Sequence, residues 1–249
     1  MKRIQPHIMC GVSDVARYVL MPGDPNRVER IAGFLDDAHK VASYRGYVTY
    51  TGRAGGVEVS ACSTGIGCPS AAIAMEELMK IGANTFIRVG TTGALVPQLD
   101  SGDIVVATGA VRLEGTSKTY LPLEYPAVAS YEVVNALLRA ANELGVKVHP
   151  GIIISSDAFY GGNDEVLKKF GEANVLAIEM ESSLIFTLAS VRGMRAGSIC
   201  TVDGNIFKGS GKGEFEPGER SGEQADRVQR GIEDEIRVAV RAVQILDEG

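Results

Sequence analysis

Residues 57–89 read VEVSACSTGIGCPSAAIAMEELMKIGANTFIRV, and this stretch gives the clearest indication of the fold class. The runs at its two ends, Val57–Cys62 and Thr85–Val89, are short, largely apolar and rich in the β-branched residues typical of strands. Between them, Pro69–Ile81 has apolar residues at helical spacing and starts with proline at a favoured first helical position. A strand, a helix and a second strand in this order are typical of an α/β protein.

The same alternation continues through the rest of the chain. Further strands are expected at Tyr18–Met21, Ile104–Ala107, Ile152–Ile154, Val175–Ile178 and Gly197–Val202. Further helices are expected at Asn26–Leu35, Tyr131–Leu144, Glu179–Val191 and Gln224–Leu246, the last with one apolar stripe and a charged opposite face. Because strands that are apolar throughout are covered on both faces, the sequence predicts an α/β protein with a largely parallel central sheet.

Length and composition restrict the class of protein. The chain has 249 residues, of which 45% are hydrophobic and 22% charged, so residues 1–249 are expected to form one folded domain. Acidic residues outnumber basic ones by 31 to 25, and a net charge of −6 disfavours nucleic acid and anionic membranes as partners. No apolar run reaches the roughly 18 residues of a membrane helix, and the N-terminus is a poor signal peptide.

Cysteine and histidine usage gives no sign of a metal site. The four cysteines, at positions 10, 62, 68 and 200, form no CxxC pair, and the chain has three histidines. We therefore expect buried structural thiols, a cytoplasmic location and no metal. The segment Lys208–Ser221 is rich in Gly, Glu and Lys and is expected to be a mobile surface loop, either a functional lid or a plain connector.

Two strand ends carry arginines suited to an anion. Gly23 and Arg27 lie between the first strand and the helix after it, where free N–H groups and a guanidinium can hold a phosphate. Arg88 lies inside an otherwise apolar strand and is followed by Thr91. A buried arginine needs a partner, which is either a structural carboxylate or an anion bound at the carboxyl end of the strand.

Carboxylates and aromatic rings mark other strand ends. Glu179 and Glu181 stand between an apolar strand and an apolar helix, where one can cap the helix and the other can accept bonds from two hydroxyls, as on a sugar. Asp203, at the end of the last strand, is either a general acid or part of an ordinary Asp-Gly turn. Phe159 and Tyr160 can stack on a flat ring or pack in the core.

Together these segments resemble the trimeric and hexameric nucleoside phosphorylase family, which includes uridine phosphorylases, hexameric purine nucleoside phosphorylases and related nucleosidases. The resemblance extends from about residue 6 to the terminal helix, and it implies a single three-layer α/β/α domain with a mixed central β-sheet. The segments that carry it are PHI (6–8), VLMPGDPNR (19–27), YRGYVTYTG (44–52), TGIGCPSAA (64–72), IRVGTTGAL (87–95), VRLEGTSKTYLPLEYPAVASYE (111–132), SSDAFY (155–160), IEMESS (178–183) and TVDGN (201–205).

The resemblance also implies roles for the matching residues, of which Asp203, Arg88 and Glu181 would be catalytic. The phosphate site would consist of Gly23, Arg27, Arg88, Thr91 and, from a neighbouring subunit, Arg45. The ribose would lie on Met180, Glu181 and the neighbour's His7, and the base on Thr92, Phe159, Tyr160, Glu179 and Asp203. Such shared sites imply a homo-oligomer, usually a hexamer built as a trimer of dimers. Inorganic phosphate would be a co-substrate, and no cofactor would be needed.

The implied reaction is phosphorolysis of a ribonucleoside to a free base and ribose 1-phosphate, and two features disagree about the base. Residues 111–132 and the TTGA turn at 91–94 look most like uridine phosphorylases, yet Gly161–Glu165 lacks the Gln and Arg with which those enzymes read uracil. Asp203, in the stretch TVDGN, resembles the acid that protonates purine N7 in the purine enzymes of apicomplexan parasites, whereas the motif of the bacterial hexameric enzymes would place that acid at Gly204. We therefore expect a purine nucleoside of the inosine, guanosine or adenosine type, with uridine as the alternative.

Two other classes of protein, nucleosidases and non-catalytic nucleoside-binding proteins, are expected to differ from a phosphorylase in these residues. A nucleosidase would use water and would lack the phosphate arginines, whereas Arg27, Arg45 and Arg88 are all present. A non-catalytic nucleoside-binding protein of the same fold is expected to have lost Glu181 or those arginines.

Overall fold

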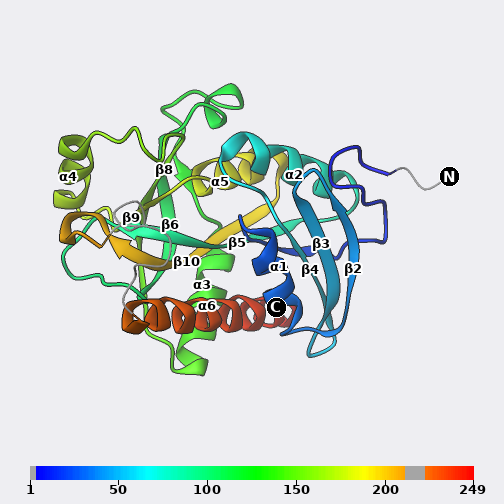
Figure 1. Ribbon diagram of the computed structural model, residues 1–249. Coiled ribbons are helices and arrows are strands. Elements are labelled where there is room, and N and C mark those ends of the chain that lie inside the picture. Colours follow the sequence, from blue (N-terminus) through cyan, green and yellow to red (C-terminus); the bar gives the residue numbers. More distant parts are fainter. Residues whose placement is uncertain (1–3, 211–221) are drawn as a thin grey trace.

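The computed structural model describes residues 4–210 and 222–249 (Figure 1). Within these residues, ten strands pair into one sheet. They are β1 (Tyr18–Met21), β2 (Asp36–Tyr44), β3 (Tyr47–Ala54), β4 (Val57–Cys62), β5 (Thr85–Ala94), β6 (Ile104–Leu113), β7 (Ala127–Val128), β8 (Val148–Ser156), β9 (Ala177–Glu179) and β10 (Arg195–Asn205).

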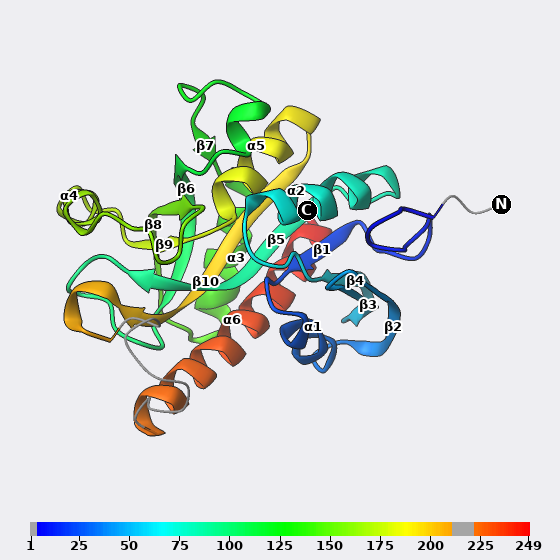
Figure 2. The same ribbon diagram turned by 45° about the horizontal axis from the view of Figure 1, so that its top comes forward.

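Helices cover the sheet on both faces. They are α1 (Pro25–Ala32), α2 (Cys68–Lys80), α3 (Tyr131–Leu144), α4 (Asp164–Glu172), α5 (Ser182–Arg192) and α6 (Gly222–Glu248), with short 3₁₀ turns η1 (Ser117–Thr119) and η2 (Ile206–Lys208). Figures 1 and 2 show α1, α3 and the long α6 on one side of the sheet, and α2 and α5 on the other.

The two helix layers bury separate hydrophobic cores, and alternate residues of one strand enter each of them. In β1, Tyr18 and Leu20 pack in the core that includes α1, α3 and α6. Val19 and Met21 pack in the core that includes α2 and α5. A strand that is buried on both faces has to be apolar at every position, and for this reason β1 could be predicted from the sequence.

The sheet closes on itself at one end. Strand β5 pairs with β10, β10 with β6, β6 with β8, β8 with β9, and β9 again with β5. The remaining strands continue from this ring in the order β1, β4, β3 and β2, while β7 pairs with β6. The ring brings the carboxyl ends of β5 and β10 next to the short β9.

The sheet is mixed, as the family resemblance implied, and the expectation of a largely parallel sheet from patterning alone was wrong. Among the described residues, five pairings are parallel and five antiparallel. Part of the antiparallel share comes from the β2–β3 hairpin, which the sequence did not predict. Its first strand, DDAHKVASY, is polar and mostly exposed, so it lacks the apolar run on which the prediction depended.

Most predicted elements form, with differences at their ends that matter for function. β1, β4 and α3 have the predicted bounds, whereas α4 was not predicted. β5 continues five residues beyond Val89, so Thr91 and Thr92 lie on the strand. β10 continues to Asn205, so Asp203 belongs to the strand, and the Asp-Gly turn alternative was wrong. α5 starts at Ser182, because Glu179 ends β9.

Several smaller expectations can be compared with the structure. All four cysteines are free and buried, as predicted, and burial raises the pKa of the Cys62 and Cys200 thiols to about 12. Among the described residues, no helix combines the length and apolarity needed to cross a membrane. Of the predicted loop Lys208–Ser221, residues 211–221 lie outside the described residues, while Lys208 ends η2.

Gly231 lets α6 approach the sheet closely, and we predict that Gly231→Ala destabilises the fold. A Cβ at this position would lie 2.6 Å from the Thr201 methyl carbon and 2.7 Å from the Gly102 carbonyl oxygen. Overpacking of this kind costs about 1–3 kcal/mol. Urea denaturation should therefore show a lower unfolding midpoint for the variant.

The matched control is Gly222→Ala in the same helix. Among the described residues, no atom lies within 4 Å of a Cβ placed on Gly222, so this change is expected to add only the better helix propensity of alanine. Equal midpoints for Gly231→Ala and the wild type would contradict the close contact between α6 and β10.

Candidate active site

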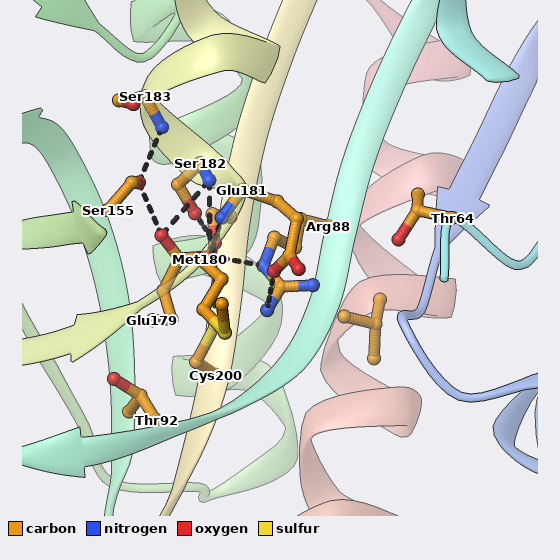
Figure 3. A network of polar contacts seen from close by, with 12 residues as sticks. Thr64, Arg88, Thr92, Ser155, Glu179, Met180, Glu181, Ser182, Ser183 and Cys200 are labelled. Atoms are coloured by element: carbon orange, nitrogen blue, oxygen red, sulfur yellow. Dashed lines mark hydrogen bonds and ion pairs between the residues drawn. The ribbon is translucent and has the colours of Figure 1, made fainter. Parts of the chain in front are cut away.

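Arg88 is the centre of a buried ionic cluster at the end of the strand ring. Arg88 lies on β5 between Ile87 and Val89, which belong to the hydrophobic core, and it is only 4% exposed. Its Nε donates to Glu179 Oε2 at 2.5 Å, and its Nη2 pairs with Glu181 Oε2 at 2.6 Å (Figure 3). The cluster thus holds one positive and two negative groups away from water, an arrangement that requires further hydrogen bonds.

Glu179 receives most of those hydrogen bonds. Its carboxylate accepts from the Ser155 hydroxyl at 2.5 Å and from the backbone N–H groups of Glu181 and Ser182 at 2.9–3.1 Å. Figure 3 shows Glu179 pointing towards Ser155 and the start of α5. Since Ser182 begins α5, the carboxylate satisfies N–H groups at the positive end of that helix. This is the capping role weighed from the sequence.

Glu181 joins the cluster to the loop between β4 and α2. Its Oε1 accepts from the Gly67 backbone N–H at 2.5 Å. Gly67 has φ 90°, a left-handed conformation that favours glycine, and this turn aims its N–H at the carboxylate. Burial raises the pKa of Glu181, with Arg88 acting against the rise and the like charge of Glu179 adding to it.

The third nitrogen of the Arg88 guanidinium is open. Among the described residues, Nη1 is buried and has no hydrogen-bond partner. A Cβ placed on Gly23 would lie 3.9 Å from Nη1 and 3.2 Å from the Gly65 carbonyl oxygen, so Gly23 faces this nitrogen without filling the space beside it. An unpartnered guanidinium N–H in a buried position is suited to bind an anion.

Arg27 lies on the other side of Val89. It is buried on α1, and its Nη1 donates to the Val89 carbonyl oxygen at 3.3 Å. The same Nη1 is 3.4 Å from Glu235 Oε1 on α6. Burial raises the pKa of Glu235 to about 7, while Arg27 and a hydrogen bond from Thr201 act in the opposite direction. Arg27, from α1, therefore contacts β5 at the residue that follows Arg88.

Asp203 lies beside β5 at an irregularity of the sheet. The pairing of β10 with β5 joins Val202 to Thr92 and then Gly204 to Gly93, so Asp203 is an extra residue in the strand. Such a bulge redirects side chains and is frequent next to binding sites. Asp203 is buried, and the Thr92 hydroxyl donates to the Ile178 carbonyl oxygen at 2.7 Å.

Met180 completes the central group. It stands between β9 and α5 and is half-buried, and its carbonyl oxygen accepts from the Cys68 thiol at 3.1 Å. The structure thus brings together nine of the residues singled out from the sequence, on β1–α1, β5, β9–α5 and β10. They are Gly23, Arg27, Arg88, Thr91, Thr92, Glu179, Met180, Glu181 and Asp203.

Four other residues singled out from the sequence lie elsewhere. His7 Nδ1 contacts Glu77 Oε1 of α2 at 2.6 Å, and the exposed Arg45 stacks on Tyr44 in the β2–β3 turn. In residues 4–210 and 222–249, neither has a hydrogen bond or ion pair to Arg27, Arg88 or Glu181.

Phe159 and Tyr160 follow β8 and are 53% and 93% exposed, with their rings edge to face at 4.9 Å. The alternative that they pack in the core was therefore wrong.

One group of side chains has the composition of a metal site. Ligand atoms of Cys68, Glu114 and Asp157 lie within 4.8 Å of one another. The Glu114 carboxylate already accepts hydrogen bonds from Ser117 and Ser183, and burial raises the pKa of the Cys68 thiol, which keeps it protonated. These contacts describe a hydrogen-bonded carboxylate and give no support for a bound ion.

Three residues of the site were not identified from the sequence. Ser155 follows an apolar strand but belongs to a pair of ordinary serines, and Gly67 is one glycine among 30. Glu235 had a usable signal: it is three residues after Ile232 and four before Ala239, on the apolar stripe of α6. A lone carboxylate on such a stripe indicates a buried charge with a specific partner.

The chain is similar to known proteins over most of its length. The family model described as phosphorylase superfamily matches residues 17–243. A guanosine phosphorylase of Halorubrum lacusprofundi is 47% identical over 242 residues, which cover 97% of this chain and 99% of that protein. A uridine phosphorylase of Thermococcus kodakarensis is 49% identical over 81% of this chain and 78% of its own length. A uridine phosphorylase of Treponema pallidum is 43% identical over 96% of this chain and 93% of its own.

These matches extend over nearly the whole chain and include every strand and helix that contributes to the Arg88 cluster. The family resemblance drawn from the sequence motifs is confirmed, and the chain belongs to the phosphorylase superfamily.

Proposed function

We propose that this chain cleaves purine ribonucleosides of the inosine, guanosine or adenosine type by phosphorolysis, releasing free base and ribose 1-phosphate. The observation that carries the proposal is Arg88, which holds Glu181 on Nη2 and leaves Nη1 open beside Gly23. One guanidinium then joins an anion site to a carboxylate suited to sugar hydroxyls. Similarity to the guanosine phosphorylase over 99% of that protein supports the same reaction and a purine base.

The phosphate site comprises Gly23, Arg27, Arg88 and Thr91, with Arg45 supplied by a neighbouring copy. Arg88 Nη1 donates to the anion, and Arg27 adds a second guanidinium from the far side of Val89. Gly23 leaves room for phosphate oxygens, because any side chain there would approach the Gly65 carbonyl and Nη1. Charge-assisted hydrogen bonds from fixed donors give such a site its affinity.

The ribose lies on Glu181 and Met180, with His7 of a neighbouring copy at the 5′-hydroxyl. Glu181 accepts from the 2′- and 3′-hydroxyls. Its two oxygens also contact the Gly67 N–H and Arg88 Nη2. These same contacts fix the carboxylate at the point where the anion site and the sugar meet, so that the attacking oxygen and the anomeric carbon are placed together.

The base stacks on Phe159 and Tyr160 and is protonated by Asp203. The exposed ring pair after β8 is available to a flat ligand, and Thr92 is next to the strand bulge that carries Asp203. For Glu179, the observed contacts favour orientation of Arg88 over the base contact expected from the sequence, because both carboxylate oxygens already accept several hydrogen bonds.

The reaction follows from these positions. The glycosidic bond breaks with positive charge developing on the sugar, which the phosphate dianion stabilises and then attacks. The arginines hold that dianion, and Glu181 holds the ribose at the correct distance. Asp203 gives its proton to N7 of the leaving purine, so the base departs as a neutral molecule. Phosphate is the co-substrate, and no step requires a further cofactor.

The site is proposed to be complete only in an oligomer, in which each unit is one domain of residues 1–249. Arg45 lies exposed at the tip of the β2–β3 turn, and His7 is held on α2 by Glu77, so both side chains belong to surfaces that a second copy can meet. A hexamer built as a trimer of dimers is the assembly we propose. The four free cysteines support a reducing compartment such as the cytoplasm.

Uridine is the alternative base. Several similar proteins are uridine phosphorylases, including that of Thermococcus kodakarensis at 49% identity. The alternative lacks a group to read uracil, since Gly161–Glu165 carries neither Gln nor Arg.

The test of the proposal is base release from guanosine, inosine, adenosine and uridine, each with and without phosphate. We expect release from at least one purine nucleoside that depends on phosphate, with little release from uridine. Preference for uridine would establish the alternative base. Release without phosphate would indicate a hydrolase, and release from none of the four would indicate a binding protein.

Replacing Arg88 should impair phosphate binding. In Arg88→Gln the open Nη1 and the positive charge are lost, and loss of a buried charge-assisted contact corresponds to a KM for phosphate raised by roughly 10²-fold. Steady-state kinetics with varied phosphate measures this, with a thermal melt to verify folding. The control is Arg53→Gln, an exposed arginine paired with exposed Glu58, which should leave the KM unchanged. An unaltered KM in Arg88→Gln would refute the proposed phosphate site.

Replacing Asp203 should impair departure of the base. Asp203→Asn keeps the size of the side chain but has no acidic proton to give, so kcat for the preferred purine nucleoside should fall by roughly 10²-fold. The control substrate is 7-methylguanosine, whose base is already cationic and leaves without protonation. Cleavage of that substrate should stay near the wild-type rate in Asp203→Asn. Equal losses on both substrates would assign Asp203 a structural role.

A further inference from the structure

Glu235 is a carboxylate buried beside the middle of β5, and the reaction described above does not use it. It lies on α6 and is 0% exposed. Its Oε2 accepts from the Thr201 hydroxyl at 2.7 Å, and Thr201 pairs with Thr91 across the sheet. Its Oε1 has no hydrogen bond among the described residues and is 3.4 Å from Arg27 Nη1. In the described part of the chain, the neighbouring Arg27 guanidinium is therefore the ionic partner of this carboxylate oxygen.

The charged and polar groups around Glu235 come from three elements. Arg27 faces it from α1, Arg88 acts on it from β5, and β10 contributes the Thr201 hydroxyl and the Cys200 thiol. On α3, the Glu143 carboxylate is engaged by Arg241, which is six residues further along α6. In the described part of the chain, β3 and β4 contribute no ionic partner to Glu235.

The position of Glu235 creates a conflict when an anion binds. Arg27 is shared between Glu235 on one side and the proposed phosphate site on the other. A dianion at that site and an ionised Glu235 would repel one another across a buried region, where the effective dielectric constant is low and such repulsion is strong. Either the anion binds weakly, or Glu235 loses its charge.

We infer that Glu235 is a positioning residue of the anion site: it holds the Arg27 guanidinium against Val89 of β5, and it takes up a proton from the solvent when a dianion binds. This inference rests on the phosphate site of the proposed function. The step is a simple protonation of one carboxylate oxygen, with no other bond made or broken.

The environment of Glu235 places this exchange near neutral pH. Burial raises its pKa to about 7, against the opposing effects of Arg27 and Thr201. A bound dianion raises the pKa further. Below pH 7 the carboxyl is therefore already neutral and anion affinity should be constant. Above pH 7 each binding event must bring in a proton, so affinity should fall as the pH rises.

Inorganic sulfate is the probe, because it remains a dianion from pH 6 to 8.5 whereas phosphate itself titrates. Calorimetry on the wild type should give a dissociation constant about tenfold higher at pH 8.5 than at pH 6, within the usual range for coupled sites. Titrations at pH 8 in two buffers of different ionisation enthalpy should show proton uptake. A purely structural carboxylate would give neither result.

Three variants isolate the carboxylate. Glu235→Gln keeps the acceptor for Thr201 and removes the charge, so sulfate affinity should be independent of pH, equal to the low-pH value of the wild type, and without proton uptake. Glu235→Asp retains a titrating carboxyl and should keep the pH dependence. Thr201→Val removes the hydrogen bond that lowers the pKa of Glu235, so the loss of affinity should begin at higher pH. Thr201→Val also provides the test if Glu235→Gln does not fold.

The outcomes separate this inference from the proposed function. Sulfate binding that is weakened in Arg88→Gln but independent of pH in the wild type would leave the phosphate site intact and overturn the role of Glu235. Unchanged pH dependence in Glu235→Gln would overturn it as well. If sulfate does not bind the wild type, or binds Arg88→Gln equally well, the phosphate site is wrong and the inference fails with it.

Discussion

Burial of the Arg88 guanidinium beside Glu179 and Glu181 is the constraint on which the rest of the active-site region depends. Each charge comes from a different element, so β5, the end of β9 and the start of α5 have to meet at one point. Breaking such a pair leaves an uncompensated charge and costs about 3–5 kcal/mol. Gly90 has to lack a side chain, because a Cβ there would lie 2.8 Å from the guanidinium. The ionic cluster therefore fixes local packing as well as local chemistry.

The strands that are buried on both faces could be predicted from the sequence, because burial requires them to be apolar throughout. β1 and β4 have the bounds that their apolar runs predicted. The polar edge strand β2 and the surface helix α4 carry no such pattern and were missed. Closure of the strand ring depends on β9 pairing with β5 and β5 with β10, residues about 85–110 positions apart. No local pattern specifies such pairings, so only the family resemblance anticipated a mixed sheet.

The site residues that could be predicted from the sequence are charged residues that stand within or beside apolar stretches. An arginine within an apolar strand and two carboxylates before an apolar helix conflict with simple burial, and the structure brings Arg88, Glu179 and Glu181 into contact. The sequence posed two alternatives for Arg88, a structural ion pair or an anion ligand. They prove compatible, because Nε and Nη2 bind carboxylates while Nη1 has no partner among the described residues. The roles of Ser155 and Gly67 could not be predicted in this way, because they arise from backbone geometry and packing.

Charge balance explains why one chain does not complete the proposed phosphate site. Arg27 and Arg88 supply two positive charges, while Glu179, Glu181 and Glu235, when ionised, supply three negative ones. A dianion would then enter a buried region that is already net negative, where repulsion is strong. In the proposed oligomer, Arg45 of a neighbouring copy would add one positive charge, and the proposed protonation of Glu235 would remove one negative charge. The site would become net positive only if both occurred, so the proposed oligomer and the proposed proton uptake would meet the same electrostatic requirement.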